Sequence, residues 1–70
     1  MTYEVFFQTR DYLPIGDVDD PCDCHLFNGV DLPIRDEAGL TLIYGSQSSP
    51  TYVVFVPLDQ LLYVETVREQ

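Results

Sequence analysis

Three prolines and an Asn-Gly pair exclude a long helix from the middle of this chain. Pro14, Pro21 and Pro33 each lack a backbone donor and fix φ, and Asn28-Gly29 is a strong turn signal. No uninterrupted stretch of residues 14–37 is therefore long enough for a stable helix. Short strands, turns and loops remain for this part of the chain.

Apolar residues alternate with polar ones on both sides of this region. Tyr3, Val5 and Phe7 give the first segment one apolar face, and the later segments GLTLIYG and TYVVFV are rich in β-branched and aromatic residues. The pattern predicts strands over 2–9, 39–45 and 51–56. The polar sequence SQSSP, residues 46–50, is predicted to be a hairpin loop between the last two.

The middle and the end of the chain are less regular. Asn28-Gly29 predicts a two-residue turn between short strands at 25–27 and 30–34, where Pro33 demands an edge position. Residues 10–38 are otherwise predicted to be a long excursion from the sheet. The phrase FVPLDQLLYVE, residues 55–65, resembles the strand, 3₁₀ turn and strand that end SH3-like barrels. Leu58, Leu61 and Leu62 also have helical spacing, but the β-branched and aromatic content favours a strand over 61–67.

These elements predict a mainly β fold. We expect a small twisted antiparallel sheet or SH3-like partial barrel of four to five strands, with a long acidic loop region. The first strand is expected to pair with the C-terminal strands. Seventy residues, 46% of them hydrophobic, predict a single domain over 1–70 with a modest core.

The charge balance narrows the classes of partner. Twelve acids stand against three arginines and no lysine, which gives a net charge of −9. Such a surface repels nucleic acid and anionic membranes and attracts basic proteins and cations. Seven of the acids lie within residues 16–37, where only Arg35 offsets them. The predicted partner-binding residues are these seven: Asp17, Asp19, Asp20, Asp23, Asp31, Asp36 and Glu37.

The first residues and the apolar runs predict the cellular compartment of the protein. The chain begins MTYEVFFQTRD, without the charged and apolar regions of a signal peptide, and its longest apolar runs are far too short to span a bilayer. We therefore expect a cytoplasmic protein with reduced cysteines and no membrane contact.

The stretch GDVDDPCDCH, residues 16–25, raises the question of a metal site. Cys22, Cys24 and His25 are its candidate ligands, but a zinc site usually draws on two separated ligand pairs, and the chain has no second pair. A calcium loop fails because Cys22 stands where glycine is needed and Asn28 where a bidentate Glu is needed. We expect no cofactor, and these three residues remain weak candidates.

The same stretch offers little for catalysis. The carboxylates around the two cysteines favour the neutral thiol, and the chain's one histidine lacks an evident orienting group and pocket. We therefore expect no enzymatic activity.

A chain that is small, strongly acidic and free of lysine resembles phage-encoded anti-defence proteins, the anti-CRISPR and anti-restriction proteins of the DNA-mimic type. The resemblance implies a stoichiometric inhibitor that occupies the positively charged nucleic-acid channel of a nuclease or surveillance complex in the host cytosol. Carboxylates would then replace phosphates as partners of Arg and Lys.

Three other interpretations of this sequence remain open. The acidic face can serve solubility alone. The chain can be a small metal-binding regulatory domain that uses Cys22, Cys24 and His25. It can also be a phage structural or assembly module, whose exposed β-edges drive formation of a homodimer or larger oligomer.

Overall fold

Six strands make up nearly all of the described chain. The computed structural model describes residues 1–15 and 22–69, and only the backbone of 63–68. The elements are β1 (Tyr3–Leu13), β2 (Cys22–Val30), β3 (Leu32–Asp36), β4 (Gly39–Gly45), β5 (Pro50–Pro57), the 3₁₀ turn η1 (Leu58–Gln60) and β6 (Leu61–Glu69). The described residues contain no α-helix, and the prediction of a mainly β fold is confirmed.

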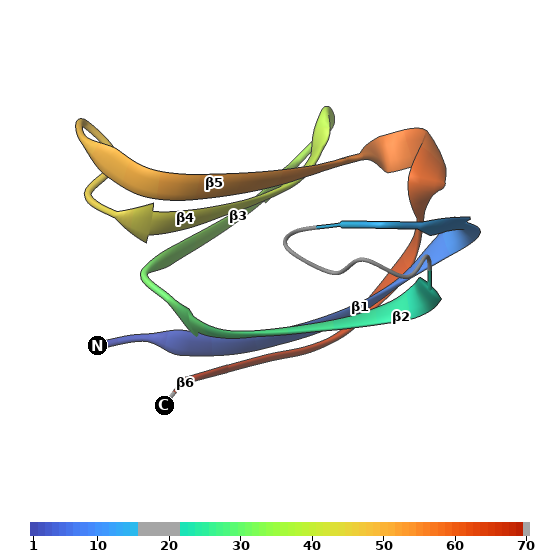
Figure 1. Cartoon of the computed structure of the whole chain (residues 1–70), viewed down its shortest axis with the longest axis horizontal. Coiled ribbons are helices and arrows are strands. Elements are labelled where there is room, and N and C mark those ends of the chain that lie inside the picture. The colour runs from blue at the N-terminus through green and yellow to red at the C-terminus, as the bar shows by residue number, and fades with distance from the viewer. Residues whose placement is uncertain (16–21, 70) are drawn as a thin grey trace.

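The strands form two antiparallel sheets of three, in the orders β2-β1-β6 and β3-β4-β5. Figure 1 shows the chain rising from one sheet to the other after β2 and returning through η1. The first strand pairs with the last, with Tyr3 opposite Glu69, so that both ends of the chain lie on one side. This pairing was expected from the sequence and is confirmed.

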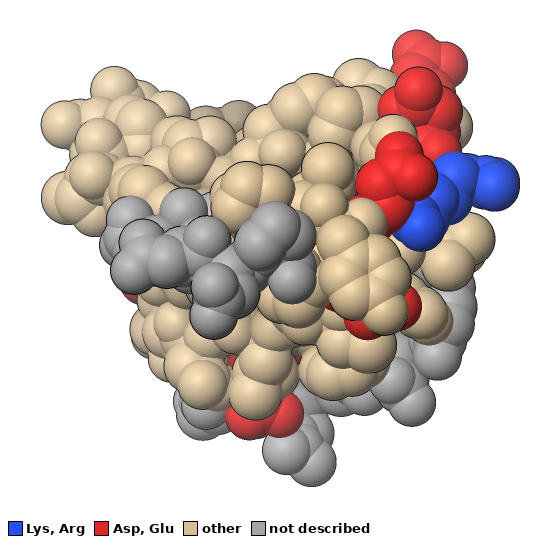
Figure 2. Space-filling model, turned by 45° about the vertical axis from the view of Figure 1, so that its right-hand side comes forward, with Lys and Arg blue, Asp and Glu red and all other residues tan. Residues whose placement is uncertain are grey.

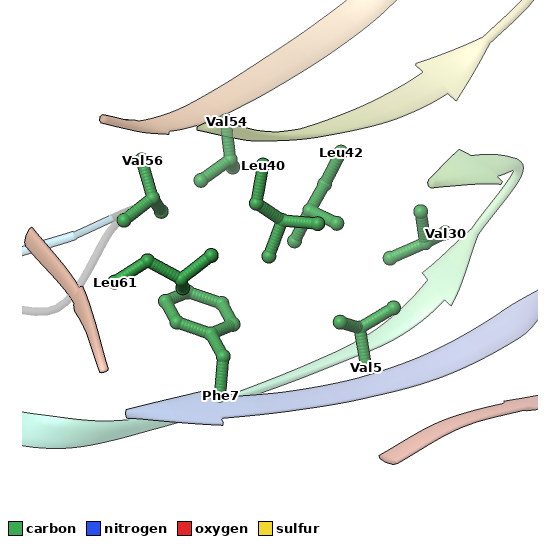
Figure 3. Packing of buried hydrophobic residues seen from close by; sticks show 8 residues of the cluster. All are labelled: Val5, Phe7, Val30, Leu40, Leu42, Val54, Val56 and Leu61. Carbon is green, nitrogen blue, oxygen red and sulfur yellow. The ribbon is translucent and has the colours of Figure 1, made fainter. Parts of the chain in front are cut away.

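Alternate residues of the two sheets face each other and form the core. Val5 and Phe7 of β1 point toward Leu40 and Leu42 of β4, while Val56 of β5 closes the cluster (Figure 3). All five side chains are buried. Burying side chains of this size stabilises a fold by about 1.5–3 kcal/mol each, so this small cluster is the main source of stability.

The prediction of a turn at Asn28-Gly29 is wrong. β2 continues through both residues, and the register shows an extra residue there: Tyr3 faces Val30, but Val5 faces Phe27. Gly29 has φ of +71°, as a glycine-containing β-bulge requires. The Asn-Gly signal therefore marks a positive φ, which a bulge uses as readily as a hairpin turn.

The prediction of a long loop over 10–38 is also wrong for most of its length. β1 extends to Leu13, where it pairs with Cys22, and both β2 and β3 lie within this region. Pro33 does occupy an edge strand, because β3 pairs only with β4 among the described residues. Charged residues such as Arg35 and Asp36 of β3 blunt such an edge against pairing with other chains.

The end of the chain follows its prediction. A single 3₁₀ turn spans Leu58–Gln60 and is followed by strand and not by α-helix. The backbone N–H of Leu58 donates to the carbonyl of Ala38 at 3.0 Å, which fastens η1 to the β3–β4 turn. Gly39 is required at this crossing because a Cβ there would collide with the carbonyl oxygen of Val56.

Candidate functional site

Acidic side chains from three elements meet at one end of the molecule. Asp36 ends β3 and Glu37 follows it in the β3–β4 turn, Asp59 belongs to η1, and Asp11 lies near the end of β1. We call these four residues the acidic corner. All are exposed, and Figure 2 shows acidic side chains gathered at one corner of this face, with basic side-chain atoms directly beside them. Exposed Arg10 and Arg35 directly precede Asp11 and Asp36, so the corner carries more acids than bases and its charge is partly offset.

Hydrogen bonds tie the three elements of the acidic corner together. Gln60 Nε2 donates to Asp11 Oδ2 at 2.8 Å, and the backbone N–H of Asp11 donates to Gln60 Oε1 at 3.3 Å. The bond from Leu58 to Ala38 joins η1 to the β3–β4 turn. These contacts position the acids before any partner arrives, which lowers the entropy cost of binding.

Asp36 also shapes its own turn. Its Oδ1 accepts a hydrogen bond from the backbone N–H of Ala38 at 2.9 Å. This is the local side-chain-to-backbone contact that favours Asp at turns. The carboxylate keeps further acceptor positions in solvent, so the turn contact leaves it able to meet a cationic side chain.

The other predicted partner-binding acids lie elsewhere. Asp17, Asp19 and Asp20 fall outside the described residues. Asp23 lies near the start of β2, where Gln8 Nε2 donates to it at 3.4 Å. Asp31 follows β2 and accepts a hydrogen bond from the backbone N–H of Gly45 at 2.8 Å.

Among the described acids, only Asp36 and Glu37 come together as the sequence predicted. Asp31 and Asp36 bound β3, and five steps of extended chain separate them by about 16 Å. Asp11 and Asp59 were missed. They lie 48 positions apart in the sequence, and no local pattern signals that Gln60 joins their elements.

The chain's histidine lies in the core and not in the acidic surface. His25 is 4% exposed, and its ring stacks on Phe7 with centroids 5.1 Å apart. Its Nε2 lies 3.3 Å from Thr9 Oγ1, and its Nδ1 lies 3.6 Å from Cys22 Sγ. Burial lowers the pKa of His25 below its ordinary value of 6.5, against opposing effects of the Cys22 backbone and the Asp23 charge.

Both ring nitrogens of this histidine have a partner. Thr9 Oγ1 donates to the carbonyl oxygen of Asp11 at 2.8 Å and lies beside His25 Nε2. Nδ1 lies beside Cys22, and which ring nitrogen carries the proton depends on the tautomer. A neutral His25 therefore fits this buried position.

Of the three weak metal candidates, Cys22 and His25 lie together, with Sγ and Nδ1 3.6 Å apart, but Cys24 does not join them. His25 points into the core, whereas the adjacent Cys24 is exposed. Among the side chains that the structure describes, those of residues 1–15, 22–62 and 69, no three of His, Cys, Asp or Glu lie close enough together to hold a metal ion. Cys22 and Cys24 form no disulfide. Alternation along β2 explains why Cys24 and His25 are separated, because neighbouring residues of a strand point to opposite faces.

The chain was compared with family models, curated proteins and solved structures. No family model, no curated protein and no solved structure matches it. Among the described elements, none is a helix of the length and apolar character needed to cross a bilayer.

Proposed function

We propose that this chain is a non-enzymatic acidic interaction protein that binds the positively charged nucleic-acid-binding surface of a host protein complex, as DNA mimics and anti-CRISPR inhibitors do. The observation that carries the proposal is the acidic corner, on a chain with twelve acids and no lysine. Four exposed carboxylates from three elements lie toward one end of the molecule, and exposed Arg10 and Arg35 can offset only part of their charge.

The chemistry of recognition would be that of a phosphate backbone. Each exposed carboxylate can accept charge-assisted hydrogen bonds from Arg or Lys, as a phosphate does. A basic channel gains little from an isolated exposed ion pair, but several preorganised carboxylates act as a network. The hydrogen bonds between Gln60 and Asp11 supply that preorganisation. No cofactor and no turnover are involved.

The remaining acids of the predicted set extend the proposed surface. Asp17, Asp19, Asp20 and Asp23 precede or begin β2 and keep their proposed role as partner contacts. Asp31 has a structural bond to Gly45, so we expect its contribution to binding to be smaller than that of Asp36. Asp19→Asn with Asp20→Asn is the matching test for the first group, and it should weaken partner binding and leave the fold intact.

The experiment is affinity capture from a host lysate at low salt, followed by binding measurements on the captured complex. Binding should weaken steeply as salt rises, and added duplex DNA should displace the chain from its partner. Asp36→Asn with Glu37→Gln should lower the affinity about tenfold or more at low salt. Asn at position 36 keeps the acceptor that Ala38 requires, so the turn is preserved.

A matched variant separates position from total charge. Glu4→Gln with Glu69→Gln removes the same two charges at the end of the molecule where the chain termini pair. It should bind within about twofold of the wild type. If both double variants weakened partner binding equally, the total charge of the chain and not the position of the acidic corner would account for binding. Binding that resists both salt and DNA would contradict the proposed function itself.

A further inference from the structure

The outer face of β3-β4-β5 is apolar and uncovered. The inward side chains of this sheet are the core residues of β4 and β5, so the alternate positions point outward. The residues of this face are Leu32, Ile34, Thr41, Ile43, Val53 and Phe55. Figure 1 shows no described strand or turn over the outer side of this sheet. We call these six residues the apolar face.

The strand register arranges the apolar face in two rows across the sheet. Ile43 lies between Leu32 and Val53 in one row. Thr41 lies between Ile34 and Phe55 in the other. Neither row contains a charged residue, which is the composition found at the centres of protein interfaces.

Exposure singles out one edge of the apolar face. Phe55 is 50% exposed and Val53 is 46% exposed, whereas Ile43 in the middle strand is 7% exposed because its neighbours cover it. The two exposed side chains adjoin each other on β5, so their apolar surfaces are continuous. A Phe presented in this way is the kind of anchor that fills a pocket on a partner.

The apolar face ends at the acidic corner. Asp36 pairs with Gly39, two positions along each strand from the row that contains Ile34 and Thr41. Asp36 therefore borders the apolar face, and Glu37 follows it in the turn. An apolar centre with a charged rim on one side is a common anatomy for an interface.

We propose that the apolar face is the docking surface for a protein partner that presents an apolar patch bordered by Arg or Lys. Charge complementarity selects this occupant, because the rim is acidic and the whole chain carries −9. A second copy of the chain would bring −9 against −9, so repulsion opposes self-association through this face. The inference rests on the proposed function and adds a second, apolar component to it.

Two synthetic peptides of equal length and charge serve as probes. One alternates Lys with Val and the other alternates Lys with Ser, so that only the first carries an apolar face. At 150 mM salt, the Lys–Val peptide should bind about tenfold more tightly than the Lys–Ser peptide. Phe55→Thr should abolish that difference, because it removes the exposed ring and puts in its place a β-branched residue that suits a strand.

Leu26→Thr is the matched control. Leu26 is 53% exposed, and it lies on the other sheet, opposite Phe6. This variant should keep the tenfold preference for the Lys–Val peptide. Circular dichroism and melting curves establish that each variant is folded, and Val53→Thr replaces Phe55→Thr if the latter does not fold.

The outcomes distinguish the two proposals. If neither peptide binds even at low salt, the proposed function fails and the docking surface fails with it. If the Lys–Ser peptide binds as tightly as the Lys–Val peptide, or if Phe55→Thr behaves like Leu26→Thr, only the docking surface is overturned. Sedimentation that shows a wild-type dimer and a Phe55→Thr monomer would also overturn it, because the occupant would then be a second copy.

Discussion

At the scale of single residues, His25 couples the core to pH. Its ring lies between Thr9 and Cys22 and stacks on Phe7, and the surrounding burial favours the neutral form. The unfolded chain exposes the same ring to water, where its ordinary pKa of 6.5 applies. The two states therefore bind different numbers of protons over a defined range of pH.

The first prediction is that stability falls as the pH falls below about 6.5. Because burial lowers the pKa of His25 in the folded state, the unfolded state takes up its proton first. The contribution is complete above pH 6.5 and declines from there until the pH reaches the lowered pKa. The slope of this decline is at most about 1.4 kcal/mol per pH unit for one proton. Urea unfolding at a series of pH values measures it.

A substitution isolates the histidine from the carboxyl groups. His25→Gln removes the titration and retains an amide that can donate to Thr9. The variant should be less stable at neutral pH, but its stability should change less between pH 7.5 and 5.5 than that of the wild type. Parallel pH profiles for the two proteins would show that His25 does not carry the dependence.

At the scale of elements, two glycines with positive φ differ in how closely other backbone atoms approach them. Gly39 has φ of +142°, and a Cβ there would collide with the carbonyl oxygen of Val56. Gly29 has φ of +71°, and a Cβ there would meet only a side-chain carbon of Tyr44 at 4.0 Å. The crossing between the β3–β4 turn and η1 is therefore much less tolerant than the bulge in β2.

The second prediction follows from this difference. Gly39→Ala should lower the free energy of unfolding by about 2–4 kcal/mol, because the backbone must both strain and move. Gly29→Ala should lower the free energy of unfolding by about 1 kcal/mol, because alanine must adopt a left-handed conformation there but meets no clash. Urea unfolding compares them directly. Equal losses would mean that the crossing at Gly39 relaxes easily.

Local alternation explains how much of the fold could be predicted from the sequence. The strand over 39–45 matches β4, and the turn at Leu58–Gln60 was also anticipated, because both depend on neighbouring residues. The Asn28-Gly29 turn was wrong because one positive φ serves both a turn and a bulge. An Asn-Gly pair fits a hairpin turn and a β-bulge equally, and only the pairing with the neighbouring strand distinguishes them.

The candidate site was less predictable than the strands. Asp36 and Glu37 were anticipated because they adjoin each other in an acidic segment. Asp11 was not, since a bond to Gln60 across 49 positions brings its strand to the acidic corner. The apolar face could not be anticipated either, because it depends on which side of β5 faces the core.

At the scale of the whole molecule, function and stability make opposing demands on the charge. A compact fold with a net charge of −9 repels itself, and that repulsion is strongest where acids are concentrated. The acidic corner gathers four carboxylates in one place. If it serves a basic partner, it does so at the expense of the free chain's stability.

The last prediction measures this opposition. Asp36→Asn with Glu37→Gln, the variant expected to bind its partner less well, should be more stable than the wild type by about 0.5–1 kcal/mol at low salt. The gain should shrink in 0.5 M NaCl, because the salt screens the repulsion that the substitutions remove. Urea unfolding at both salt concentrations supplies the comparison, with Glu4→Gln and Glu69→Gln as the control of equal charge. That control should gain less, because its two charges lie outside the acidic corner. If this variant is less stable than the wild type at low salt, these acids stabilise the β3–β4 turn more than they repel each other. A structural role would then account for the acidic corner without a partner.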